Sequence, residues 1–355
     1  MGSIRLFLAF AVLMSHADAC DINIIPGQVA VQAFFIISGF YMSLILTQKY
    51  EKCSVFVFYT NRLLRLFPAY LFMLFVSFGL LYALDVGILM YIDKFKKVFT
   101  HGLFMAVSYL WANIAVLGQE ILFLLGIDTA TYSFYWAPNG MASVKAWNYV
   151  LIPQAWSLSM ELYFYVLAPL ILRQRMRWVG GIFVLSLALR LFIVSKGVEY
   201  DLFLRRFFPG ELCLFLIGSF SYFLFTRIKE YRRKYSVGLI CWITLLTVFV
   251  FYNEINEKYS LTLLAFTMFL SMPFIFNLAT HSRLDRFLGN ISYPIYIVHF
   301  LTVAVFEEYF EEEYPFFLLL LAVFSASLVV YYGIEAPIDR WRQRRVRFLH
   351  SSQVA

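Results

Sequence analysis

Long apolar segments follow one another along the whole chain, separated by connections that carry most of the charge. The segments lie at about 3–20, 28–47, 66–84, 156–172, 178–195, 207–226, 236–252, 260–279, 290–306 and 316–334. A helix needs roughly 20 apolar residues to cross a bilayer, whereas a membrane β-barrel uses strands of about ten residues with alternating hydrophobicity. The pattern therefore predicts an all-α, polytopic membrane helical bundle of about ten transmembrane helices.

The composition of the chain agrees with a membrane protein. Of its 355 residues, 62% are hydrophobic and 14% are charged, whereas an ordinary soluble domain has about 25% charged residues. These values exclude a disordered chain and a nucleic-acid-binding domain, and they make membrane lipid the expected surroundings. The cysteines show no metal-ligand spacing, so we expect neither a metal site nor a disulfide framework.

Basic residues are divided unequally between the two alternating sets of connections. Of the 29 lysines and arginines, 20 fall in one set and eight in the other. Because basic residues favour the cytoplasmic side of a membrane, this division predicts that both chain termini are cytoplasmic. In a bacterial inner (plasma) membrane, 1–5, 48–65, 227–234 and 338–355 are then expected in the cytoplasm and 307–313 outside.

One further apolar segment, 101–126, disturbs the alternation. If it crossed the membrane once, every later connection would change sides and the basic residues would no longer segregate. We therefore expect a re-entrant pair of half-helices or an interfacial element at the outer surface. Backbone of that kind at membrane depth needs cover from protein or from a water-filled cavity. An eleven-span topology is the alternative.

The chain is expected to form a single integral-membrane domain over 1–340, followed by a basic cytoplasmic tail at 341–355. The first segment also imitates a secretory signal peptide, because the apolar run 6–14 precedes an Ala-x-Ala sequence at 17–19. The many apolar segments that follow favour a first transmembrane helix instead. We also expect no appended domain after Arg347, since only a few residues remain.

Ionisable residues inside apolar segments are candidates for function, because they are costly in lipid. Arg5 and His16 are eleven residues apart in the first segment. On a helix they return to nearly the same face, about 16 Å apart along the axis. Asp21 follows just past this segment, where its carboxylate could reach the imidazole. The alternative is an arginine and a histidine that simply lie at the two membrane interfaces.

Two further places combine polar residues with apolar surroundings. Arg62 and Arg65 are neighbours on a helix turn, and paired guanidinium groups suit phosphate because each offers a fixed fork of donors. The alternative is a basic flank that only orients the third span. Glu161 lies near the start of the fourth span. It either faces a polar cavity and exchanges protons, or gains from the helix dipole behind an N-cap at Ser157.

Together these residues resemble acyltransferase family 3, the integral-membrane O-acyltransferases that modify extracytoplasmic glycans and related acceptors. The resemblance covers 3–340 and rests on five motifs in order. They are Arg5 to His16; Phe34-Phe35-Ile36-Ile37-Ser38-Gly39-Phe40; Arg62-x-x-Arg65-Leu-Phe-Pro68-x-Tyr70; Trp156-Ser157-Leu158-Ser159-Met160-Glu161; and the pair Ser292-Tyr293-Pro294-Ile295-Tyr296-Ile297-Val298-His299 and Tyr332-Gly-Ile-Glu335-Ala-Pro337. One departure is Leu162, which stands where family members often carry a second acidic residue.

The resemblance implies transfer of an acyl group, usually acetyl, from cytoplasmic acyl-CoA to a hydroxyl of a glycan or lipid-linked saccharide outside the membrane. It implies that His16 and Glu161 are catalytic, with Asp21 expected beside the imidazole. The arginine pair described above would hold the phosphates of the donor, with Arg5 as a companion cation. His16 would act as the general base or would carry the acyl group itself.

A transporter or flippase for a lipid-linked sugar is the competing hypothesis, in which the charged residues line a passage. Such a protein is expected to carry related repeats in its two halves. No repeat stands at equivalent positions in this sequence, and an acyltransferase is therefore the favoured interpretation.

Overall fold

The computed structural model describes residues 1–17, 24–51, 54–89, 91–100, 102–128, 130–131, 133–137, 142–196, 203–228, 235–280, 282–310 and 314–351. Its principal helices are α1 (Gly2–Met14), α2 (Gly27–Gln48), α3 (Val55–Leu84), α4 (Ile92–Thr100), α5 (Leu103–Ile114), α6 (Gln119–Leu122), α7 (Trp156–Leu172), α8 (Met176–Ser195), α10 (Phe208–Arg227), α11 (Tyr235–Val250), α12 (Glu257–Ala279), α13 (Arg283–Phe310), α14 (Phe316–Val330) and α15 (Ala336–Ser351). The π-helical turn η5 (Tyr331–Glu335) joins α14 to α15.

The predicted membrane bundle is confirmed. Within the described residues, eight helical segments are long and apolar enough to cross a membrane. Each of the ten predicted apolar runs overlaps a helix, and the two that are not among these eight segments, α1 and α11, have 13 and 16 residues. The eight segments are Gly27–Gln48, Val55–Leu84, Pro153–Leu172, Met176–Ser195, Phe208–Arg227, Glu257–Ala279, Arg283–Phe310 and Phe316–Val346.

The third helix begins earlier than the hydrophobic pattern suggests. The apolar run was expected from 66, but α3 starts at Val55, where the Ser54 side chain accepts a hydrogen bond from the Val57 amide. An N-cap of this kind satisfies one amide that lacks a partner within the helix. As a consequence, Arg62 and Arg65 lie inside a continuous helix and not in a loop before it.

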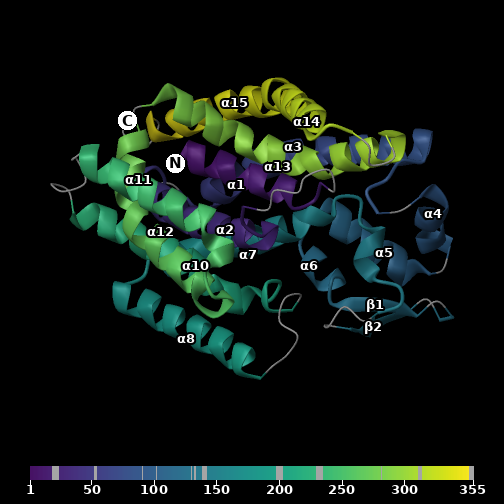
Figure 1. Cartoon of the computed structure of the whole chain (residues 1–355), viewed down its shortest axis with the longest axis horizontal. Coiled ribbons are helices and arrows are strands. Elements are labelled where there is room, and N and C mark those ends of the chain that lie inside the picture. Colours follow the sequence, from purple (N-terminus) through teal and green to yellow (C-terminus); the bar gives the residue numbers. More distant parts are fainter. Residues whose placement is uncertain are drawn as a thin grey trace.

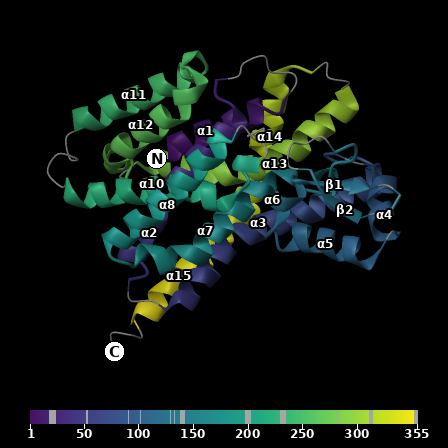
Figure 2. The ribbon, with the colours of Figure 1, turned by 90° about the horizontal axis from the view of Figure 1, so that it is seen from below.

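Segment 101–126 forms no continuous spanning helix. It contains α5, α6 and the start of strand β1 (Leu125–Asp128), which pairs in antiparallel register with β2 (Ser133–Trp136). This hairpin is an addition to the predicted all-α architecture. Together with α4 it lies at the opposite end of the molecule from α11 and α12 (Figures 1 and 2). The finding agrees with an element that does not span, as the charge division required.

Helix α2 is the centre of the bundle and packs against α1, α7, α10 and α12. Its closest approach is to α10, where a Cβ built on Gly39 would lie 1.7 Å from the Phe215 carbonyl oxygen. On the opposite helix, a Cβ on Gly218 would lie 1.8 Å from the Ile36 carbonyl oxygen. Small residues of this kind allow two membrane helices to pack backbone against backbone. Ser38 and the rest of one α2 face are thereby brought beside α7.

Helix α1 is fixed to the beginning of α13. The carboxylate of Asp285 accepts hydrogen bonds from the Gly2 and Ser3 amides at 2.7 and 2.9 Å and from the Ser3 hydroxyl at 2.9 Å. A Cβ on Gly2 would lie 1.6 Å from the Asp285 carbonyl oxygen, so only glycine allows this approach. These contacts determine where the polar residues of α1 lie.

Candidate active site

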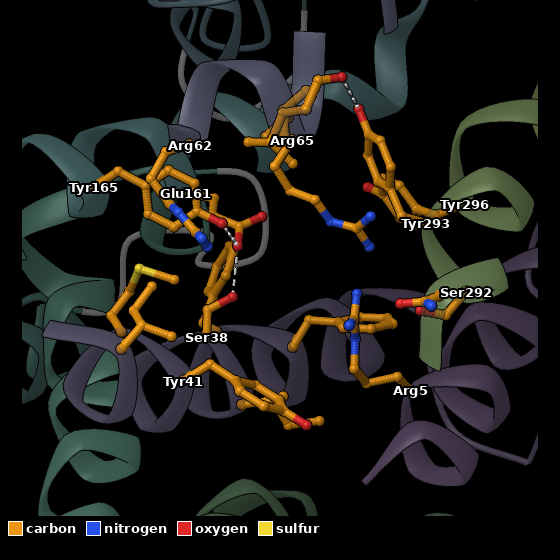
Figure 3. A pocket seen from close by; sticks show the side chains of 18 of the residues that line it. Arg5, Ser38, Tyr41, Arg62, Arg65, Glu161, Tyr165, Ser292, Tyr293 and Tyr296 are labelled. Atoms are coloured by element: carbon orange, nitrogen blue, oxygen red, sulfur yellow. Dashed lines mark hydrogen bonds between the residues drawn. The ribbon is translucent and has the colours of Figure 1, made fainter. Parts of the chain in front are cut away.

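A cavity of about 350 Å³ lies among α1, α2, α3, α7, α13 and α15. Figure 3 shows its side chains converging from these separate elements. Five arginines line it: Arg5, Arg62, Arg65, Arg286 and Arg342. Four of them come from segments predicted to be cytoplasmic, namely 1–5, 48–65 and 338–355, and the fifth, Arg286, has an exposed side chain.

Three of the predicted residues, Arg5, Arg62 and Arg65, face this cavity together. Arg5 and Arg65 point into the same space from opposite sides (Figure 3). Arg65 donates to Glu335 at 3.1 Å, and that carboxylate belongs to the π-helical turn. Turns of this kind occur frequently at functional sites, because they displace one residue from the regular helical path.

The guanidinium groups of Arg5 and Arg62 form no ion pair with a carboxylate in the described part of the chain. The Arg62 guanidinium lies 5.9 Å from the Phe58 ring and 6.0 Å from the Tyr165 ring, and its Nε is buried without a hydrogen-bond partner. Buried cations normally have a carboxylate or other anion as partner. The cavity is therefore suited to an anionic ligand such as phosphate.

Glu161 lies in the same cavity, as expected for a carboxylate facing polar surroundings. Its Oε1 accepts a hydrogen bond from the Ser38 hydroxyl at 2.6 Å and one from the Tyr165 hydroxyl at 2.5 Å (Figure 3). Both donors are neutral, so the carboxylate is oriented without having its charge cancelled. Glu161 and Arg62 both line the cavity.

The alternative interpretation of Ser157 as an N-cap is wrong. Helix α7 begins at Trp156 with Ala155 as its N-cap residue and no side-chain cap. Ser157 is instead the second helical residue, and its hydroxyl lies 2.6 Å from that of Tyr296. Both residues line the cavity. The helix start is buried inside the protein, which explains why its serine pairs with a neighbouring helix.

His16 lies apart from this cavity, in the turn that follows α1. Its Nδ1 is 2.7 Å from the Val12 carbonyl oxygen. A nitrogen that faces a carbonyl carries the hydrogen, which leaves Nε2 of the neutral ring as a base. Asp21, predicted to approach this ring, lies outside the described residues. The structure thus brings together Arg5, Arg62, Arg65 and Glu161, but not His16.

A second histidine, which ends the motif Ser292 to His299, lies against His16. The ring centroids of His16 and His299 are 5.5 Å apart. His299 is fully buried on α13, and its Nδ1 lies 2.8 Å from the Tyr296 carbonyl oxygen. Tyr296 contacts the His299 ring and also lines the arginine cavity, so it joins the pair of histidines to the cavity.

No group of three or more His, Cys, Asp and Glu side chains is placed to hold a metal ion in the described ranges.

Arg286 and Arg342 line the cavity although the sequence did not single them out. Arg342 was expected in a basic tail, yet it is buried in helix α15 and donates to the Asn61 carbonyl oxygen at 3.2 Å. A cluster of arginines after the last span does not itself indicate which one turns inward.

Comparison with known proteins gives a consistent set of relatives. The sequence model of a family described as "Acyltransferase domain" (Acyl_transf_3) matches residues 2–335. O-acetyltransferase OatA of Staphylococcus aureus strain NCTC 8325 / PS 47 is 24% identical over 385 residues, covering 98% of this chain and 58% of that protein. OatA of strain COL gives the same values. The chain therefore spans less than two thirds of the length of these relatives, and no solved structure matches it.

Proposed function

The chain belongs to this acyltransferase family, and on that premise we propose that it is a membrane O-acyltransferase with acyl-CoA as its donor. The acyl group, in the first place acetyl, passes to a hydroxyl of a glycan or lipid-linked saccharide on the extracytoplasmic side. The O-acetyltransferase names of the relatives support this acceptor chemistry.

The observation that carries the proposal is the cavity with five arginines, of which Arg5 and Arg62 form no ion pair in the described part of the chain. Acyl-CoA carries its phosphates at one end and its thioester at the other end of a long, flexible pantetheine arm. Guanidinium forks bind such phosphates with paired, charge-assisted hydrogen bonds. The cytoplasm is where acyl-CoA is found, and the positive-inside rule assigns these arginines to that side.

In the proposed reaction His16 is the general base. Its Nε2 takes the proton of the acceptor hydroxyl while the oxygen attacks the thioester carbon. A C–O bond forms, the C–S bond breaks, and the proton finally passes to the CoA sulfur. Positioned bases of this kind typically contribute about 10²–10⁴-fold to the rate.

The separation between the cavity and His16 has a natural role in this scheme. Arg5 and His16 are eleven residues apart, which corresponds to about 16 Å along a helix. A donor whose phosphates stay among the arginines must therefore extend its thioester past Tyr296 to reach the imidazole. Glu161 lines the cavity, and in this scheme its negative charge supports catalysis.

The test uses membranes that contain the full chain, labelled acetyl-CoA and the envelope glycans of the source organism. We expect label in the glycan with the wild type and none with His16→Ala at equal amounts of inserted protein. Equal labelling by the variant would contradict the role of His16. Absence of acetyl-CoA binding to the purified protein would contradict the donor, and movement of a lipid-linked sugar without labelling would support a transporter.

The orientation of the protein is tested separately. With both termini in the cytoplasm, 307–313 is outside. We expect a Phe310→Cys variant in a background without other accessible cysteines to react with an impermeant thiol reagent from the outside. A cysteine at residue 229 serves as the cytoplasmic control, and labelling of position 310 only from the inside would overturn the topology.

A further inference from the structure

His299 is a buried histidine with one nitrogen unused. Its side chain is 0% exposed, and its Nδ1 faces the Tyr296 carbonyl oxygen at 2.8 Å. That nitrogen therefore carries the hydrogen, and Nε2 holds a lone pair. Nε2 is buried and has no hydrogen-bond partner. Buried polar atoms in folded proteins are nearly always paired, so an exception calls for an explanation.

The surroundings of His299 point to its neighbour His16. The two ring centroids are 5.5 Å apart, and the ring of Phe300 packs 4.5 Å from that of His16. His16 is exposed, whereas His299 is enclosed behind it. Each Nδ1 faces a backbone carbonyl, of Val12 in one case and Tyr296 in the other. Both rings are thus held in the same tautomer, with Nε2 as the basic atom.

We propose that His299 is a positioning residue for acyl transfer, whose Nε2 shares the proton that His16 takes from the acceptor hydroxyl. The inference rests on the proposed function and extends it, because it assigns a second histidine to the same step. Nε2 of His299 has no hydrogen-bond partner in the structure, so the proposal requires the exposed His16 ring to turn toward it. With the ring centroids 5.5 Å apart, a rotation of the His16 ring can bring its N–H within hydrogen-bond distance of this lone pair.

The proton balance of this step is complete. The hydroxyl proton passes to Nε2 of His16, and the resulting imidazolium shares it, through a hydrogen bond, with the lone pair on Nε2 of the neutral His299. When the C–S bond breaks, the same proton passes from His16 to the CoA sulfur. No oxidant, metal or further reactant is needed. His299 therefore orients and stabilises the imidazolium while the acyl group is transferred.

Among the described residues, two titratable side chains have ring contacts with His299. They are His16, in the turn after α1, and Tyr296, on the same helix as His299. Gln154, which precedes α7, is neutral and donates to the Ile297 carbonyl oxygen at 3.1 Å. No ion pair involves His299 in the described ranges.

The experiment compares His299→Phe and His299→Gln with the wild type in the labelled acetyl-CoA assay. Phenylalanine keeps an aromatic ring, and glutamine keeps a hydrogen-bond acceptor that cannot take up a proton. We expect both to lower kcat at least about tenfold, below the effect of removing the base itself, with KM for acetyl-CoA unchanged. Phe306→Leu on the same helix is the control for packing and is expected to retain activity.

The pH dependence separates a proton role from a structural one. A hydrogen bond from the imidazolium to His299 favours the protonated form of His16, so we expect the pKa on the acid side of the log kcat profile to be lower in His299→Phe, which has no acceptor, than in the wild type. Full activity of His299→Phe, or an unchanged acid-side pKa in that variant, would overturn the inference.

Failure of the inference is distinguishable from failure of the proposed function. If His16→Ala is inactive while His299→Phe is fully active, only the role of His299 is wrong. If His16→Ala is itself active, the general base has been assigned incorrectly. A thermal unfolding midpoint for each variant in detergent shows that the comparison is made on folded protein, and the glutamine variant decides the question if the phenylalanine variant does not fold.

Discussion

Two places in this membrane bundle bury arginine together with glutamate, and they differ in how the charges are paired. Between α8 and α10, Arg190 donates to Glu211 at 2.5 Å. Gln32 of α2 donates to both oxygens of the same carboxylate, at 2.9 and 3.1 Å. In the arginine cavity, by contrast, Glu161 receives hydroxyl groups only, and Arg62 has a buried Nε without a partner.

The difference shows how to interpret ionisable residues inside a membrane protein. Such residues suggest function because they are costly in lipid, yet the Arg190–Glu211 pair is largely buried and joins two helices. A buried arginine paired with a glutamate contributes to the structure, whereas unpaired charges beside a cavity are suited to binding a ligand. The four predictions below test this distinction, from the largest expected effect to the smallest.

Replacing Glu161 by glutamine tests whether its charge is needed for the reaction. Glu161→Gln keeps an acceptor for Ser38 and Tyr165 but removes the negative charge from the cavity. We expect the rate of acyl transfer to fall by about 10²–10⁴-fold, while the thermal unfolding midpoint in detergent stays unchanged. Undiminished transfer would make Glu161 a structural residue like Glu211.

Glu211→Ala is the converse experiment. It leaves Arg190 and Gln32 buried without their partner, and we expect a loss of about 3–5 kcal/mol in the free energy of unfolding. The double variant Arg190→Met, Glu211→Leu replaces the pair by apolar side chains and is expected to recover most of this loss. Denaturant unfolding in detergent measures both. Single and double variants of equal stability would show that the pair contributes no such coupling.

Lysine substitutions in the cavity test whether the arginines bind the donor. Lysine keeps the positive charge that orients the helix but lacks the planar fork. For Arg62→Lys we expect acetyl-CoA affinity to fall by about tenfold or more, equivalent to roughly 1–3 kcal/mol. Arg65→Lys should have a smaller effect, because Arg65 is already shared with Glu335. Donor affinity unchanged in the double variant would leave both arginines with a role in topology alone.

Glu120, outside the spanning segments, provides a third kind of buried carboxylate. Tyr163 donates to its Oε1 at 2.9 Å, while its Oε2 is buried without a partner. Burial raises the pKa of the Glu120 carboxyl above its ordinary value, because the charged form is desolvated. Its contribution to stability is then fully present below the ordinary pKa and is lost as the pH rises through the raised one.

We expect Glu120→Gln to remove this pH dependence. The measurement is the thermal unfolding midpoint between about pH 4 and 8, where the wild type should lose more stability than the variant as the pH rises. We expect this effect to be the smallest of the four. Each kcal/mol of lost stability lowers the thermal unfolding midpoint by about 2–4 °C. Parallel pH curves for both proteins would contradict the assigned pKa shift.

Much of the site could be predicted from the sequence because its charged residues lie in or beside segments that are otherwise apolar. Arg5 and Glu161 interrupt apolar segments, Arg62 and Arg65 immediately precede one, and all four line one cavity. The catalytic role of His16 stays a prediction, as does that of Asp21. His299 escaped notice because a single histidine in an apolar helix is ordinary; only its unpaired Nε2 and the contact with His16 distinguish it.

The sequence by itself determined the class of protein, since the length and hydrophobicity of each segment decide whether a helix can reside in lipid. It also indicated which residues are costly enough there to need a purpose. The tertiary structure decided which charges meet. Arg342 turns inward from a helix expected to be a tail, and Arg190 finds Glu211 across a helix interface. These pairings depend on helix rotation and on close contacts such as Gly39 against Phe215, which arise only when segments distant in the sequence pack together.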